Sequence, residues 1–294
     1  MKRLWASPVL LLLLTGVMLG LSLPLGKLAS AAGLPPILWA FVVSCGAAAV
    51  LFPALALTGG VRRPDWHRLR YFAITAVVSY ALPNLLLFSV IPKVGAGYAG
   101  IMFTLSPVIT LLLSLTLGIR RPNWLGMAGI ATGFVGALMV ALSRGGLEQP
   151  AAAVWVFAAL FIPVSLAAGN IYRTVDWPKG AGPIELAVGS NGAAAVVLFA
   201  ASLLFTGGLP VAALLSVPLL TLAQVAAAAG MFAVYFRLQE VGGPVYLSQI
   251  GYVAAAVGLL FGTLLFGEHY SLVTWAGAAL IVLGVTLTTL AQRR

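Results

Sequence analysis

The sequence predicts an all-α integral membrane protein, with ten transmembrane helices arranged as two inverted five-helix repeats. Three observations predict this fold: an extreme composition, apolar blocks of regular length, and short motifs that recur half a chain apart. The chain is 62% hydrophobic and 7% charged, whereas a soluble domain carries about 25% charged residues. A soluble fold of this size cannot bury so much apolar surface, so lipid must surround most of it.

Ten apolar blocks have the length that a membrane-spanning helix requires, about 20 residues for a hydrocarbon layer of about 30 Å. The blocks do not alternate apolar and polar residues, which excludes a β-barrel. The first block is too long for a cleaved signal peptide, so we interpret it as a retained helix. Short connections leave no room for a soluble domain. The blocks lie at 8–31, 36–58, 69–90, 94–118, 123–142, 152–172, 184–206, 214–236, 244–267 and 273–291.

The basic residues predict the orientation, because cytoplasmic loops of membrane proteins are rich in Lys and Arg. With both termini in the cytoplasm, the outer segments hold only Lys27, Lys93 and Arg144. This asymmetry accounts for the net charge of +10. Basic residues form no stripe with interleaved aromatics, so no nucleic-acid partner is expected. The inner segments hold Lys2, Arg3, Arg62, Arg63, Arg68, Arg70, Arg120, Arg121, Arg173, Lys179, Arg237, Arg293 and Arg294.

Short motifs of the first half recur in the second half. Five spans in each half is an odd number, so the second repeat enters the membrane from the opposite side. We expect the repeats to cover 1–147 and 148–294. Inverted repeats are typical of secondary transporters, whose substrate site lies near the bilayer midplane. The paired motifs are GLSLPLGK at 20–27 with AAGNIYR at 167–173, VGAGY at 94–98 with VGGPVY at 241–246, WLG at 124–126 with WAG at 275–277, and Gly133 with Gly284.

Several of these runs resemble one family of membrane proteins. GLSLPLGK, TLSPVITLLLSLTLG at 104–118, and GTLLFGE at 262–268 followed by WAGAALIVLGV are similar to motifs of the EamA-type exporters of the drug/metabolite transporter superfamily. The Pro83-Asn84 pair and the IPKVGAGYAGIMFTLSPV run look most like the YddG-like aromatic amino acid exporters. Arg120 departs from the family, which often keeps an acid there. The resemblance implies an inner-membrane exporter of amino acids or similar metabolites that works by alternating access.

Polar and aromatic side chains inside the blocks are candidates for a substrate pathway, because polar groups that face lipid are costly. Each also has a structural interpretation. Asn84 can cap the backbone freed by Pro83, and Ser22 can bond its own helix. The tyrosines can belong to an interfacial belt or to helix contacts. The candidates are Ser22, Tyr80, Asn84, Tyr98, Met102, Asn170, Tyr246, Gln249 and Tyr252.

Two basic residues are candidate gates. The repeat relates Lys27 to Arg173, and each lies near the end of a block. Each could close one entrance by pairing with an acid or with a substrate carboxylate. The simpler interpretation is that both side chains extend along the helix to reach the membrane surface.

All six acidic residues fall in loops or at block ends. A proton-coupled antiporter usually carries a carboxylate inside the membrane, and a cation exporter needs buried negative charge or an aromatic cage. Aromatic or neutral amino acids, accepted with broad specificity, fit the sequence better. The alternatives are an exporter of cationic or amphipathic drugs and other toxic compounds, and a proton-coupled metabolite antiporter.

No enzyme motif or Cys/His cluster is present in the sequence, so we expect no catalysis, no cofactor and no metal. The expected partners are a small-molecule substrate and the lipid bilayer, with the chain as a monomer or weak homodimer. A channel would require rings of charge or carbonyls. The five-plus-five pseudo-symmetry fits a rocking carrier better than a channel.

Overall fold

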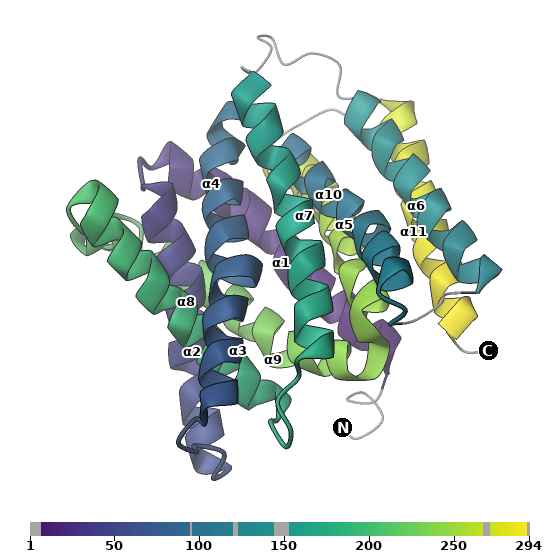
Figure 1. Ribbon diagram of the computed structural model, residues 1–294. Helices are drawn as coiled ribbons and strands as arrows, with labels where there is room; N and C mark the ends of the chain where they lie inside the picture. Colours follow the sequence, from purple (N-terminus) through teal and green to yellow (C-terminus); the bar gives the residue numbers. More distant parts are fainter. Residues whose placement is uncertain (1–6, 95, 120–122, 144–152, 267–270, 293–294) are drawn as a thin grey trace.

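The computed structural model is a bundle of helices that lie at varied angles to one another (Figure 1). It describes residues 7–94, 96–119, 123–143, 153–266 and 271–292, and these contain no β-strand. The predicted repeat boundary at 147/148 lies outside these residues. The helices are α1 (Pro8–Ala31), α2 (Pro36–Leu57), α3 (Trp66–Thr75), η1 (Ala76–Ala81), α4 (Leu82–Val94), α5 (Ala96–Thr116), α6 (Trp124–Ser143), α7 (Ala153–Val175), α8 (Pro183–Thr206), η2 (Val211–Ser216), α9 (Pro218–Ser248), α10 (Ile250–Phe266) and α11 (Leu272–Gln292).

Within the described part of the chain, six helices are long and apolar enough to cross a membrane. Helical residues occupy all ten predicted blocks, but ten spans remain a prediction, because three further apolar helices are shorter. The six are Pro8–Ala31, Pro36–Leu57, Trp66–Lys93, Phe157–Val175, Pro183–Thr206 and Pro218–Ser248, and the shorter ones are Phe103–Thr116, Trp124–Gly136 and Trp275–Thr288.

The third block contains a π-helical turn, η1, between α3 and α4. Pro83 is the second residue after this turn and has no backbone N–H to donate. In π-helical pairing the carbonyl of Val78 would take its hydrogen from residue 83. Ser165 of α7 donates its hydroxyl to that carbonyl instead, at 2.5 Å. A side chain of the second half therefore satisfies the carbonyl that the proline leaves without a donor.

Helix α9 is interrupted at Gly243, whose φ of 72° and ψ of −179° are not helical. Only glycine adopts this backbone region readily. Pro244 follows at once, and the helix then resumes to Ser248 before Gln249 separates it from α10. The break coincides with the predicted start of the ninth block at 244.

Helices of the two halves interlock rather than forming two separate bundles. In the first set of contacts, α1 packs on α9 and α10, and α7 packs on α4 and α5. In the second set, α2 packs on α8 and α9, while α8 also packs on α3 and η1. Helices α5 and α10 contact each other, and α6 packs extensively on α11 (Figure 1).

Glycines set the close approach of α6 and α11. A Cβ atom added to Gly284 would lie 2.5 Å from the backbone nitrogen of Gly133, and one added to Gly136 would lie 2.5 Å from the carbonyl oxygen of Gly277. The two backbones are therefore in direct contact, which is how small residues join helices in lipid. Gly133 and Gly284, matched by the sequence repeat, face each other at this crossing.

We expect Gly284→Ala to force α6 and α11 apart, because the new methyl group would overlap backbone atoms rather than a flexible side chain. Overpacking of this kind costs about 1–3 kcal/mol. The melting temperature of the purified protein in detergent should fall. Gly192→Ala in α8 is the matched control, because its Cβ would meet nothing within 4 Å. Equal melting temperatures for the two variants would contradict the close crossing.

Candidate functional site

A cavity of about 50 Å³ lies between the two halves of the chain. Its walls come from α1, η1, α4 and α5 of the first half and from α7, α9 and α10 of the second. This volume is smaller than that of most pockets for small molecules, about 300–1,000 Å³. The polar side chains that line it are Ser79, Tyr80, Asn84, Ser106, Asn170, Tyr235 and Ser248.

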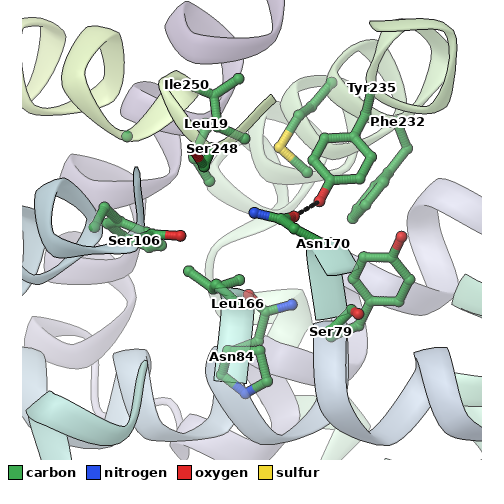
Figure 2. A pocket seen from close by; sticks show the side chains of 15 residues that line it. Leu19, Ser79, Asn84, Ser106, Leu166, Asn170, Phe232, Tyr235, Ser248 and Ile250 are labelled. Atoms are coloured by element: carbon green, nitrogen blue, oxygen red, sulfur yellow. Dashed lines mark hydrogen bonds between the residues drawn. The ribbon is translucent and has the colours of Figure 1, made fainter. Parts of the chain in front are cut away.

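Two asparagines offer hydrogen-bonding groups to the cavity (Figure 2). The Oδ1 atom of Asn170 accepts hydrogen bonds from Arg173 at 2.7 Å and from the Tyr235 hydroxyl at 3.4 Å, which leaves its Nδ2 group pointing into the cavity. The amide of Asn84 also lines the cavity and has no hydrogen bond to another described residue. A bound molecule can therefore receive and donate hydrogen bonds here without breaking an existing pair.

The rest of the lining is apolar and aromatic. Phe103, Leu166 and Met231 contribute to it, and Phe232 meets the Tyr80 ring edge-on with centroids 5.0 Å apart. Among the described lining residues there is no acidic side chain. The cavity therefore combines neutral hydrogen-bonding groups with a surface that accepts apolar side chains.

Arg173 lies directly behind the polar wall of this cavity, and its side chain is fully buried. Its Nε atom donates to Oε1 of Gln239 at 2.9 Å, and its Nη2 atom donates to Asn170 Oδ1 and to the Tyr235 hydroxyl. The expectation that this side chain extends to the membrane surface is therefore wrong. Neutral partners on α9 and within α7 turn the guanidinium inward.

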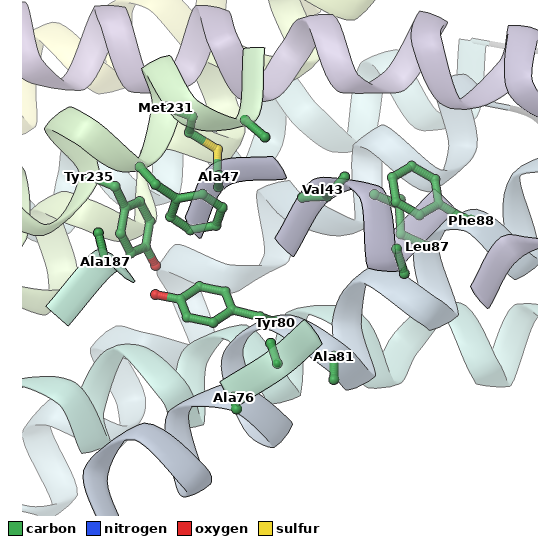
Figure 3. Close-up of a cluster of buried hydrophobic side chains, with 14 of the residues drawn as sticks. Val43, Ala47, Ala76, Tyr80, Ala81, Leu87, Phe88, Ala187, Met231 and Tyr235 are labelled. Atoms are coloured by element: carbon green, nitrogen blue, oxygen red, sulfur yellow. The ribbon is translucent and has the colours of Figure 1, made fainter. Parts of the chain in front are cut away.

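Two tyrosine rings lie beside the same guanidinium. The carbon Cζ of Arg173 is 5.1 Å from the centroid of the Tyr235 ring and 5.7 Å from that of Tyr80. The hydroxyl groups of Tyr80 in η1 and Tyr235 in α9 point toward each other (Figure 3). The faces of aromatic rings attract cations, so the rings offset part of the cost of burying this charge.

The structure brings together three predicted pathway residues, Tyr80, Asn84 and Asn170, at the cavity. Ser22 lies elsewhere in the core, where its hydroxyl accepts a hydrogen bond from Gln224 at 3.1 Å. Tyr246 is buried without lining the cavity.

Gln249 and Tyr252 are also fully buried away from the cavity lining. The side-chain amide atoms of Gln249 have no hydrogen-bond partner, and the Tyr252 hydroxyl donates to the carbonyl of Ile130 at 3.3 Å. The backbones of Tyr98 and Met102 belong to α5, but their side chains lie outside the described part. Lys27 is half-buried in α1.

Sequence reasoning missed several cavity residues: Ser79, Phe103, Ser106, Met231, Phe232, Tyr235 and Ser248. One signal could have found Tyr235. It lies four residues before Gln239, as Asn170 lies three before Arg173, so each polar pair shares one helix face. Two such pairs at the ends of apolar blocks predict a contact between α7 and α9.

A second polar cluster lies at the end of the bundle where the loop that follows α2 meets the loop that follows α7. Arg70 of α3 donates to Asp176 Oδ1 at 2.8 Å, and the Tyr172 hydroxyl donates to Oδ2 at 2.6 Å. His67 Nε2 lies 3.0 Å from Oδ1. Burial raises the pKa of Asp176, but the hydrogen bonds from Tyr172, Arg70 and His67 outweigh it and hold this pKa below its usual value.

Because the pKa of Asp176 is lower in the folded state, its stabilising effect is complete above the unfolded value of about 3.9 and is lost as the pH falls through the folded value. We expect Asp176→Asn to lower the melting temperature by a few degrees at pH 7 and to approach the native protein near pH 3. Glu240→Gln, at an exposed pair one turn from Arg237, is the control and should change little. If the melting temperatures of the native protein and of Asp176→Asn changed with pH in parallel, the lowered pKa of Asp176 would be contradicted.

Comparison with known proteins supports both the fold and the class of the chain. Residues 6–142 match the family model described as "EamA-like transporter family". Twenty-nine chains of solved structures match. One of them, a crystal structure, is 22% identical with a TM-score of 0.71, and the match covers 95% of this chain and 98% of the other. Among curated proteins no sequence matches.

The solved structure shows that the fold extends over nearly the whole chain, while the family match covers its first half. Together with the apolar helices, these findings indicate a multi-pass membrane protein whose residues 6–142 are similar to the EamA-like transporter family.

Proposed function

We propose that the protein is a secondary transporter that moves amino acids or similar small metabolites across the inner membrane by alternating access. The observation that carries the proposal is the cavity between the halves, where the Asn84 amide and the Nδ2 group of Asn170 face a partly aromatic space inside a bundle of apolar helices. Polar groups at membrane depth belong to substrate paths far more often than to lipid-facing surfaces. Export, rather than uptake, follows only from the family resemblance.

The packing of the helices supports the two inverted repeats within this proposal. If each element of the first half is exchanged for its equivalent in the second, the contact of α1 with α10 becomes that of α7 with α5, and the contact of α2 with α9 becomes that of α8 with α3 and η1. The α6–α11 and α2–α8 pairs exchange into themselves. A pseudo-twofold axis explains this pattern, and rocking of one half against the other is the motion that it permits.

The position of the charged loops supports both termini in the cytoplasm. The loops that follow α2 and α7, both predicted inside, meet through Arg70 with Asp176 and through Arg68 with Glu185 at 2.8 Å. Lys93, predicted outside, lies 5.9 Å from the ring centroid of Trp155 at the start of α7.

An uncharged or zwitterionic substrate suits the cavity best. Asn84 and Asn170 can bind polar groups, while Phe103 and Phe232 accept an apolar side chain. One methylene changes binding by only about 1–3 kcal/mol in such a pocket, so we expect broad specificity. The predicted path continues, in this proposal, to Tyr98, Met102, Ser22, Tyr246, Gln249 and Tyr252 when the helices move.

The alternative of a cationic-drug exporter is supported by the aromatic rings but opposed by the buried positive charge of Arg173. A proton antiporter would require a titrating carboxylate in the path. The described acids Asp65, Asp176, Glu185 and Glu240 instead pair with basic residues near helix ends. We therefore favour a facilitative carrier or exchanger.

Exchange in proteoliposomes tests the proposed function. With unlabelled L-phenylalanine inside and labelled L-phenylalanine outside, we expect saturable exchange that an imposed pH gradient does not alter. Asn84→Ala should reduce exchange about tenfold or more, because a hydrogen bond to a charged substrate group contributes about 1.5–3 kcal/mol. Thr132→Ala, at an exposed position on α6, is the control and should retain native exchange.

Two results would overturn parts of the proposal. Exchange driven by the pH gradient would mean that a carboxylate or the substrate itself carries a proton. Absence of exchange with every amino acid would eliminate the substrate class.

A further inference from the structure

We propose that Arg173 is the receptor for an anionic group of the transported molecule, so that a substrate must carry a carboxylate or an equivalent anion. This inference rests on the proposed function and specifies the chemistry of its substrate. The guanidinium is fully buried, and both Asn170 and Tyr235, which it contacts, line the cavity.

The first support is an unbalanced charge. The described partners of the Arg173 guanidinium are an asparagine, a glutamine and tyrosines, all neutral. Within the described part of the chain, the acids pair with Arg68, Arg70 and Arg237 and not with Arg173. A buried charge that lacks an opposite charge is strongly unfavourable, even when hydrogen bonds and aromatic rings surround it. An anion supplied by the substrate would remove this imbalance.

The second support is an unused donor. The Nη1 atom of Arg173 is buried and has no hydrogen-bond partner among the described residues, and neither has the Oγ atom of Ser79. Both atoms border the backbone of Gly169, where a Cβ would lie 3.1 Å from Nη1 and 2.2 Å from Oγ. Ser79 also lines the cavity. Two donors without a described partner therefore lie close to the same glycine beside the cavity, and a carboxylate has two oxygens that accept such bonds.

The third support is that only neutral side chains separate the cavity from the Arg173 guanidinium. Asn170 and Tyr235 form the wall between the two, and the oxygen atoms of both accept hydrogen bonds from Nη2. A carboxylate that enters from the cavity needs to displace only these neutral acceptors, and it replaces them with stronger charge-assisted hydrogen bonds. The neutral wall thus fits a site that is held closed until an anion arrives.

A purely structural role is the competing explanation. Gln239 is bound to Arg173, and its Nε2 donates to the Asn170 carbonyl at 3.2 Å, so this network also ties α9 to α7. A structural tie predicts no dependence of ligand binding on a carboxylate. The two explanations therefore differ in a measurable way.

The test compares acid and amide forms of one ligand on the purified, full-length protein. Labelled L-phenylalanine is bound in detergent and displaced by unlabelled L-phenylalanine or by L-phenylalaninamide, which lacks the carboxylate. We expect the amide to compete about tenfold or more weakly. 3-Phenylpropionate, which lacks the amine, should compete better than 3-phenylpropanamide. Equal competition by acid and amide overturns the proposal.

Substitutions of Arg173 test whether this residue causes the preference for the acid over the amide. Arg173→Gln should bring the acid and the amide to within about threefold of each other, whereas Arg62→Gln, which removes an exposed charge, should keep the native preference. If Arg173→Gln does not fold, Arg173→Lys retains the charge and should retain preference for the acid with weaker binding. A full preference that survives in folded Arg173→Gln overturns the proposal, as does loss of preference in Arg173→Lys.

The two proposals fail in different ways. If L-phenylalanine binds and exchanges but its amide competes equally, the transport function stands and the role of Arg173 falls. If no amino acid, L-phenylalanine included, binds or exchanges, both the amino-acid class and the anion receptor are overturned.

Discussion

The structure depends on one constraint: the hydrocarbon layer offers no hydrogen-bonding partner, so each polar group at that depth must find one inside the protein. Regular helices meet this condition for the backbone. Where Pro83 interrupts the pattern, the hydroxyl of Ser165 serves the free carbonyl of Val78. Where Gln224 and Ser22 are buried in the core, they bind each other. By the same condition, hydrogen-bonding groups around the cavity that lack a described partner are candidates for binding a substrate.

Apolar attraction cannot hold these helices together in lipid, because lipid tails are as apolar as the side chains. Close backbone contact takes its place at α6 and α11, where glycines remove the side chains. Around the cavity, by contrast, polar side chains and aromatic rings link α7, η1 and α9. The tightly packed α6–α11 pair therefore serves as scaffold, while the polar residues around the cavity form the candidate site.

The sequence predicts the helical class and the locations of the helices well, because the apolar blocks are long and their ends carry charges or breakers. Asn84 and Asn170 could be singled out because amides are rare at membrane depth. The inward direction of Arg173 could not be predicted, because a basic residue near a block end fits a surface position equally well. Ser79 and Ser106 escaped notice because serine in an apolar helix can simply bond its own backbone.

The π-helical turn η1 has a consequence for which side chains reach the cavity. Such a turn holds one residue more than an α-helical turn, which changes the angular phase of everything beyond it by about 100°. Tyr80 lies within the turn and Asn84 just after it, and both line the cavity. If η1 relaxed to α-helical geometry, α4 would rotate relative to α3 and carry Asn84 around to another neighbour. The extra residue in η1 thus rotates α4 about the helix axis and determines which of its side chains face the centre of the protein.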